Sequence, residues 1–496
     1  MNALARAVSL FMTSSVIGSL TQIAKGKVAA IVLGPEGVGV LNQLVALWNM
    51  FMVGARMGFG TGITRHLATY HAEADDARFQ QHFSSSFFAL GVVALIAAAG
   101  GVVFASGLSN AIFADSGARA DFVAVIMLAV PLAVAGQVYR SLLNGTRSVS
   151  LLARARMFAD VLGMIIFALM IVPLGLFGAI IGFIALHAFY LLLVAMAARR
   201  VAPSGAVPCL PAFRWTEVAR NLRYAGNGLV TTMVQIVATL LVVRWIIVDA
   251  GLAESGLYTS ALKVAAVYMG GIYAASFGFT LPTLAALRSD AEIGREMNKT
   301  VRFYLYLLPP VVTGLIVMAE PLILVLFSAE FLGAAVLLVL LLPADLFRVT
   351  ADTCNLGLLA REKLAVSATL TVLWGGMYIG LSAVLLPVYG AVGAAMAYVL
   401  SQIVRLIATN VAIRLSLGVG MDRSTLLALA RAAAFIVPVA ALAAWREGDL
   451  VTMVASWLLA GLIWAGLSLL DDDFSRSVRR LVFIVRDRII MVRTAA

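Results

Sequence analysis

Several Lys and Arg residues lie inside stretches of the sequence that are otherwise strongly apolar. The chain has 496 residues, of which 62% are hydrophobic and 12% are charged, and its mean hydropathy is +1.00. A charged side chain near the centre of a bilayer costs about 2.5–3.5 kcal/mol on insertion scales. We therefore predict a multi-spanning membrane protein with a basic, water-filled cavity suited to an anionic cargo. The basic residues within the predicted spans are Lys25, Lys27, Arg56, Arg244, Lys263, Arg348 and Arg405.

Helix spacing separates paired charges from unpaired ones, because residues three or four positions apart share a helix face. Arg348 has Asp345 three residues before it and Asp352 four residues after it. This pattern indicates either a ladder that neutralises itself or a site at which a cation or proton resets Arg348. Arg156 and Asp160 form a second such pair, interpreted as structural, and Asp160 is a further candidate for ion coupling.

Arg56 has no acidic residue three or four positions away on either side. The same test finds no clear local partner for Lys27, Arg244, Lys263 and Arg405. Lys25 and Lys27 point about 200° apart on a helix, so at most one of them faces a cavity squarely. A partner on another helix, or a side chain that reaches the interface, is the alternative for each cation. As a group they favour a basic cavity, and a diphosphate offers the oxygens and charges that Arg and Lys bind best.

The elements that position these residues are predicted to be helices throughout, since a span needs about 20 apolar residues. About fourteen transmembrane helices are expected, at residues 7–33, 38–68, 83–106, 121–145, 151–172, 177–198, 219–248, 255–287, 301–327, 332–360, 364–386, 389–414, 425–445 and 450–470. Lys and Arg concentrate in alternate loops and in the tail 472–496, which predicts that both termini are cytoplasmic. The tail itself is predicted to lie on the inner leaflet as an amphipathic helix.

The sequence repeats itself at a shift of about 217 residues, which aligns Gly34 with Gly251 and Gly39 with Gly256. A second block pairs Gly178-Ala179 with Gly390-Ala391. Six spans in each repeat predict two six-helix lobes related by a pseudo-two-fold axis, with cargo bound between them in alternating access. The expected parts are lobes at 1–200 and 215–415, two additional transmembrane helices at 424–471, and the basic tail at 472–496.

Other signals point away from competing classes. The net charge of +11 would suggest nucleic acid in a soluble protein, but no basic run here is interleaved with aromatic residues. We expect no nucleic acid, cofactor or metal, and no disulfide between Cys209 and Cys354. The run 471–473 of three aspartates could belong to the metal site of a glycosyl- or prenyltransferase. We interpret it instead as the polar end of the last helix.

The chain resembles bacterial polysaccharide-lipid flippases of the O-antigen and lipid III type, in the multidrug/oligosaccharidyl-lipid/polysaccharide exporter superfamily. Two stretches carry the resemblance, 33–39 (LGPEGVG) after the first span and 62–71 (GITRHLATYH) at the end of the second. The similarity covers roughly residues 1–415. It implies two V-shaped lobes, and it matches Thr64 and Arg65 to a Thr-Lys/Arg pair that meets the incoming headgroup. The two additional helices are similar to those of the peptidoglycan-precursor flippases.

The sequence thus predicts a flippase, not an enzyme, that moves an undecaprenyl-diphosphate-linked oligosaccharide across a bacterial inner membrane for polysaccharide biosynthesis. The expected partners are this lipid, membrane lipids, H⁺ or Na⁺ as coupling ion, and polysaccharide polymerase and chain-length proteins. Arg348 with Asp345 and Asp352 is the predicted coupling site. A multidrug exporter is the first alternative, although such exporters usually need acids to hold cationic drugs. A polysaccharide polymerase or ligase is the second, but it would need a longer periplasmic loop.

Overall fold

The computed structural model describes residues 3–202, 207–222, 226–445 and 450–469, and every regular element within them is helical. The three aspartates at 471–473 and the tail 472–496 lie outside the described residues. The elements before the middle of the chain are α1 Ala3–Arg56, α2 Gly60–Ala72, α3 Asp76–Val103, α4 Ala105–Phe113, α5 Ala120–Met127, α6 Ala129–Gly145, α7 Val149–Arg199, η2 Leu210–Ala212 and α8 Trp215–Leu222. The later elements are α9 Asn227–Ala275, η3 Ser276–Thr280, α10 Leu281–Ala286, α11 Asp290–Val317, α12 Ala319–Leu326, η4 Ala329–Phe331, α13 Gly333–Leu341, α14 Ala344–Ala360, α15 Leu364–Leu417, α16 Arg423–Trp445 and α17 Leu450–Leu469.

Four helices are long enough to cross a membrane twice, and each contains one glycine in the left-handed region. The glycines are Gly34 (φ +63°) in α1, Gly175 (φ +55°) in α7, Gly251 (φ +92°) in α9 and Gly390 (φ +58°) in α15. Only glycine adopts such a conformation at little cost. Among the described residues, eight helical segments are long and apolar enough to cross a membrane, with α5 and α6 together as one of them, and the bent pair α13–α14 makes nine. Counting the four long helices twice and adding the shorter apolar helix α17 gives the fourteen predicted spans.

Several predicted spans are interrupted rather than continuous, which corrects the sequence-based boundaries. Span 38–68 breaks after α1, where Met57 (φ +51°) and Gly58 (φ +73°) are left-handed. Span 121–145 divides into α5 and α6, and span 332–360 into α13 and α14. Span 255–287 contains the π-helix η3, and span 301–327 is interrupted at Met318, where α11 ends and α12 begins.

The interruptions recur in both repeats. The break at Leu128 in the first repeat matches the break at residues 342–343 in the second, and Phe104 between α3 and α4 matches Met318 between α11 and α12. One predicted pairing is wrong: Gly390 corresponds by its backbone conformation to Gly175, not to Gly178. The sequence comparison matched a Gly-Ala dipeptide, whereas the chain reverses three residues earlier.

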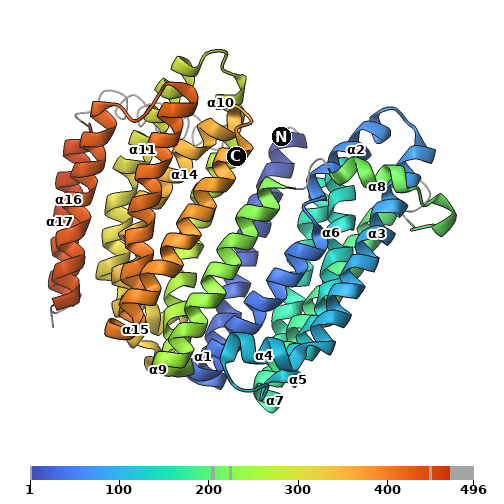
Figure 1. Cartoon of the computed structure of the whole chain (residues 1–496), viewed down its shortest axis with the longest axis horizontal. Helices are drawn as coiled ribbons and strands as arrows, with labels where there is room; N and C mark the ends of the chain where they lie inside the picture. The colour runs from blue at the N-terminus through green and yellow to red at the C-terminus, as the bar shows by residue number, and fades with distance from the viewer. Residues whose placement is uncertain (1–2, 203–206, 223–225, 446–449, 470–496) are drawn as a thin grey trace, which may run out of the picture. The chain divides into compact units, whose positions relative to one another are not determined.

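Packing divides the described chain into two compact units. Unit 1 comprises Met1–Thr259 with Leu324–Phe331 and Leu386–Ala391, and unit 2 comprises Ser260–Ile323, Leu332–Leu385 and Val392–Ala496. The first half of α9 therefore packs in unit 1 and the second half in unit 2. Within unit 1, α2 and α8 lie at the same end as the start of the chain (Figure 1).

Glycines allow a close backbone approach between repeat-related segments inside unit 1. A Cβ atom on Gly39 would lie 2.5 Å from the carbonyl oxygen of Leu252, and one on Gly256 would lie 1.9 Å from the carbonyl oxygen of Pro35. Gly256 and Leu252 are the repeat equivalents of Gly39 and Pro35, so each contact is the repeat-related copy of the other. Reciprocal contacts of this kind are the mark of a two-fold relation.

A hydrogen bond next to these glycines joins two equivalent positions. The Nδ2 atom of Asn42 donates to the hydroxyl of Thr259 at 2.7 Å, and these residues lie 217 positions apart in the sequence. A residue can contact its own equivalent only close to the symmetry axis. We name the site formed by Gly39, Asn42, Gly256 and Thr259 the glycine junction, and it marks a local pseudo-two-fold axis within unit 1.

Candidate functional site

Arg56 lies at the last position of α1, where the helix is interrupted inside the predicted membrane span. The amide of Phe59 donates to the Arg56 carbonyl at 3.0 Å, and α2 begins at Gly60. Arg56 is half-buried, and among the described residues no acid pairs with it. A broken helix of this kind is tolerated at membrane depth where it is buried in protein or lines a cavity.

Arg140 of α6 is the charge that acts on Arg56, and it repels it. One turn before Arg140, α6 packs closely against α7: the ring of Tyr190 lies 3.1 Å from where a Cβ on Gly136 would be. This contact fixes the position of α6, and with it that of Arg140. The sequence analysis missed Arg140. The test applied to Arg56 would have found it, since Gly136, Gln137, Leu143 and Asn144 include no acid.

Lys25 and the pair Arg156–Asp160 complete this group in unit 1. The Nε atom of Arg156 lies 3.6 Å from Asp160 Oδ2, which confirms the predicted pair. Lys25 interacts electrostatically with Asp160, and Tyr190 interacts with Arg140, Arg156 and Asp160. We name Lys25, Arg56, Arg140, Arg156 and Asp160 the basic cluster, which contains four cations and one carboxylate.

Unit 2 contains a different group, in which acids and cations balance. Arg348 of α14 lies 3.8 Å from Asp345 Oδ1 and 3.9 Å from Asp352 Oδ2, which is the predicted ladder. Arg405 of α15 donates to Asp352, so the prediction that it lacks a clear partner holds only within its own helix. We name Asp345, Arg348, Asp352 and Arg405 the paired network.

Tyrosines from two helices complete the paired network. Tyr268 donates to Asp345, and the hydroxyl of Tyr273 donates to Asp352 at 2.7 Å. Arg348 donates to the Tyr398 hydroxyl at 3.3 Å, and its guanidinium carbon lies 5.2 Å from the centroid of the Tyr273 ring. The second half of α9, α14 and α15 thus hold the network from three sides.

The remaining predicted residues occupy separate places. Lys27 donates to the carbonyl oxygen of Leu324 at 2.6 Å, in the last turn of α12, where a cation complements the helix dipole. Arg244 is half-buried, and its Nε atom has no hydrogen-bond partner among the described residues. Thr64 donates to the Gly60 carbonyl at 2.9 Å inside α2. Arg65 and Lys263 are exposed.

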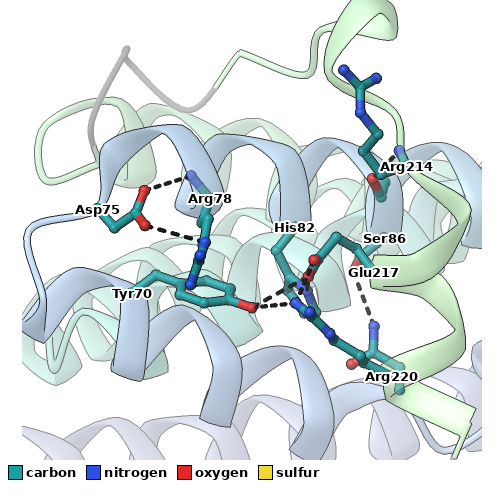
Figure 2. A network of polar contacts seen from close by, with 10 residues as sticks. Tyr70, Asp75, Arg78, His82, Ser86, Arg214, Glu217 and Arg220 are labelled. Atoms are coloured by element: carbon teal, nitrogen blue, oxygen red, sulfur yellow. Dashed lines mark hydrogen bonds and ion pairs between the residues drawn. The ribbon is translucent and has the colours of Figure 1, made fainter.

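A third group of polar residues attaches the segment between the repeats, residues 207–222, to α2 and α3. Glu217 of α8 accepts a hydrogen bond from His82 Nδ1 at 2.8 Å and one from Arg220 (Figure 2). Arg220 also donates to Tyr70 at 2.8 Å. The hydrogen bond from His82 lowers the pKa of Glu217 below its ordinary value, and the charge of Arg220 adds to this effect. We name Tyr70, His82, Glu217 and Arg220 the linker network.

Three consecutive serines of α3 extend this attachment. Ser84, Ser85 and Ser86 are fully buried, although a serine hydroxyl is costly to bury without a partner. Their hydroxyls accept from the amide of Cys209 at 3.0 Å, the amide of Arg214 at 2.8 Å and the side chain of Asn221 at 3.2 Å. Residues 207–222 are therefore a fixed part of unit 1.

These features define a class of protein: a multi-pass helical membrane transporter built from an internal repeat. The chain belongs to the polysaccharide biosynthesis protein family, whose model matches residues 28–336. It is 24% identical over 385 residues to the lipid III flippase of Escherichia coli (strain K12), covering 76% of this chain and 90% of the relative, and equally similar to that of Shigella flexneri.

Solved structures share the fold. The lipid II flippase MurJ, in an inward closed conformation, superposes with a TM-score of 0.68 at 13% identity, over 94% of this chain and 99% of that one. A multidrug resistance MATE family transporter of the MOP superfamily, in an inward-facing conformation, gives 0.67 at 16% identity, over 83% and 98%.

Proposed function

We propose that the protein is a flippase that moves an undecaprenyl-diphosphate-linked oligosaccharide from the cytoplasmic to the periplasmic leaflet. Both sequence relatives are lipid III flippases, and each match covers 76% of this chain and 90% of the relative. The proposal includes a bacterial inner-membrane location with both termini cytoplasmic, supported by the distribution of Lys and Arg in the loops. It also includes a transport role rather than an enzymatic one.

The observation that carries the proposal is the excess of positive charge in the basic cluster. Arg56 and Arg140 repel each other, and neither forms an ion pair with an acid among the described residues. A bound diphosphate would remove this repulsion and accept bidentate hydrogen bonds from both guanidinium groups. Each hydrogen bond to a charged group contributes about 1.5–3 kcal/mol.

Export of cationic drugs would require carboxylates whose charge is not already balanced by an arginine. The basic cluster and the paired network contain three acids, and each of them lies within 4 Å of an arginine. These acids are Asp160, Asp345 and Asp352. Coupling of transport to H⁺ or Na⁺ through these carboxylates remains part of the proposal. Polymerase and chain-length proteins are proposed as partners because they would act on the product.

The proposal is tested by flipping of a fluorescent undecaprenyl-diphosphate oligosaccharide in proteoliposomes. Wild type should flip the probe, and Arg56→Ala should flip it at least tenfold more slowly at subsaturating probe. Arg78→Ala, which removes an exposed arginine of the pair with Asp75, is the matched control and should behave as wild type. Equal rates for Arg56→Ala and wild type would refute the basic cluster as the headgroup site.

A further inference from the structure

The paired network of unit 2 is a poor site for a diphosphate, although it lies within a proposed lipid-diphosphate transporter. It contains two arginines and two aspartates, and each aspartate contacts at least one arginine. A phosphate would have to displace a carboxylate from its arginine, which leaves a buried charge unpaired. The network must therefore serve something other than the charged part of the cargo.

The paired network is buried at Asp345 and partly exposed at Arg348 and Asp352. The side chain of Asp345 is 1% exposed, whereas those of Arg348 and Asp352 are 27% and 25% exposed. Tyr273, one turn along α9 from Tyr268, is half-buried and contacts the open end. The open end thus consists of one aromatic ring, one guanidinium group and one carboxylate.

Buried aromatic rings support the residues at the open end of the network. Tyr398 packs against Tyr378 at 5.6 Å and against Trp374 at 6.4 Å between centroids, and both of these residues are buried. Tyr268 and Tyr273 pack on a core that includes Met269 and Tyr304. Because the supporting residues are buried, the polar groups at the open end keep a fixed geometry without a ligand.

A ring with fixed donors and acceptors beside it is the chemistry that recognises a sugar. A sugar hydroxyl both donates and accepts, so it pairs with a carboxylate and a guanidinium group at once. The C–H face of a pyranose packs on the face of an aromatic ring, which buries apolar area against it. A neutral polyhydroxyl ligand leaves the Arg405–Asp352 and Arg348–Asp345 pairs intact.

We propose that Tyr273, Arg348 and Asp352 form a subsite for a sugar ring of the transported oligosaccharide. The proposal rests on the proposed flippase function and divides the recognition of the cargo between the units. The basic cluster of unit 1 binds the diphosphate, and the open end of the paired network binds the sugar. The half-buried ring of Tyr273 supplies the packing surface beside the Arg348 guanidinium group that lies over it, while Arg348 and Asp352 supply the donor and the acceptor.

The test compares two probes in proteoliposomes at subsaturating concentration. One is the undecaprenyl-diphosphate oligosaccharide extracted from cells that express the protein, and the other is the same lipid trimmed to its first sugar. Wild type should flip the oligosaccharide probe faster. Tyr273→Leu should reduce the ratio of the two rates about fivefold to tenfold, as expected for loss of aromatic packing. Tyr273→Trp keeps a ring and should retain most of the ratio.

Arg56→Ala distinguishes this proposal from the proposed function, because it should slow both probes equally and leave the ratio unchanged. A ratio that Tyr273→Leu and Asp352→Asn both leave at the wild-type value overturns the sugar subsite. So does an equal loss for both probes in Tyr273→Leu and Asp352→Asn together with an altered dependence on pH or on a Na⁺ gradient, which would assign the network to ion coupling alone.

A second measurement does not depend on flipping. The free oligosaccharide, released from its lipid by mild acid, should show saturation-transfer NMR signals with the purified protein, and Tyr273→Leu should abolish them. Elution on gel filtration and thermal unfolding establish that this variant is folded. Signals that persist in a folded Tyr273→Leu variant contradict the subsite. Signals present in wild type without any flipping would leave the subsite standing and remove the proposed transport.

Discussion

At the scale of single residues, the basic cluster keeps like charges close together inside an apolar bundle. Two unit charges at short distance in a medium of intermediate dielectric repel by a few kcal/mol. The repulsion between Arg56 and Arg140 is tolerated because Arg140 is exposed and because Arg56 ends a helix, where the dipole favours a cation. An anion that bridges the two side chains would bind more strongly because it removes this repulsion.

Arg140 should therefore contribute to the proposed transport as strongly as Arg56. We expect Arg140→Ala to reduce flipping about tenfold or more, because one charge-assisted hydrogen bond to the diphosphate is lost. The double variant with Arg56→Ala should lose less than the product of the two single effects, since both residues bind one ligand. Initial flipping rates in proteoliposomes measure this cycle, and Arg119→Ala, which removes the partner of Asp115 in a loop, is the control.

The linker network makes a second prediction, which concerns stability. The pKa of Glu217 is lowered in the fold, so its contribution is present above the unfolded pKa of about 4.3 and is lost as the pH falls through the folded value. Glu217→Gln should lower the unfolding free energy by about 2 kcal/mol at pH 7, and less as the solution becomes more acidic.

Thermal unfolding in detergent between pH 7 and pH 3.5 measures this difference between variant and wild type. Glu296→Gln is the control, because its carboxylate forms only an exposed i,i+3 pair with Lys299. A destabilisation that stays constant over the whole pH range would show that Glu217 acts through packing rather than through its charge.

Residue-scale predictions from the sequence succeeded where helix geometry alone sets the contact. The pairs of Arg348 with Asp345 and Asp352, and of Arg156 with Asp160, follow from a spacing of three or four residues. The contacts of Arg405 with Asp352 and of Lys27 with the Leu324 carbonyl join distant parts of the chain. No local pattern contains them, because they depend on how the helices pack.

At the scale of elements, α11 and α17 show how the two additional helices attach to the repeats. Pro310 has no amide hydrogen, so the carbonyl of Tyr306 in the preceding turn lacks its helical donor. The indole of Trp464 in α17 donates to this carbonyl at 2.9 Å. The indole of Trp457, two turns earlier, donates to the Pro310 carbonyl at 3.0 Å and packs on Gly314.

Removal of one indole donor should weaken this attachment. We expect Trp464→Phe to lower the unfolding free energy by about 1 kcal/mol, since the ring remains but the Tyr306 carbonyl loses its partner. Trp215→Phe, at an exposed position of α8, is the control and should have little effect. Thermal unfolding in detergent compares the two, and equal stability would show that another donor or the lipid replaces the indole.

Element boundaries were predictable only where composition changes. The reversals at Gly34 and Gly390 follow a proline-and-glycine signal, and the sequence analysis placed both. The breaks at Met57 and Leu128 lie inside apolar stretches, where the helix period continues in the sequence while the backbone does not. Such breaks are stabilised by tertiary packing, which no local pattern in the sequence contains.

At the scale of the whole molecule, the repeat gives a physical meaning to the glycine junction. Gly39 and Gly256 approach each other's segments so closely that any side chain would clash with a backbone carbonyl. Asn42 and Thr259 then add a hydrogen bond across the local axis. If the two repeats rock against each other in alternating access, residues on this axis must separate when the junction opens.

A covalent link across the junction should therefore stop the proposed transport. Asn42→Cys and Thr259→Cys, in a background of Cys209→Ser and Cys354→Ala, can be joined by a short thiol-reactive cross-linker. We expect flipping to fall to the level of empty liposomes on cross-linking, and to return when a cleavable linker is reduced. The control pair, Ser86→Cys with Asn221→Cys, joins the linker segment to α3, to which it is already fixed.

The comparison between the two pairs makes the result specific. Cross-linking of the control pair should leave flipping unchanged, because residues 207–222 remain attached to α3 throughout. Loss of flipping with both pairs would mean that any covalent constraint disturbs the bundle, and nothing would follow about the axis. Undiminished flipping with the junction linked would contradict a transport cycle in which the glycine junction opens. The repeats would then have to move the cargo while the glycine junction stays closed, by bending at the interrupted helices near Met57 and in η3 instead.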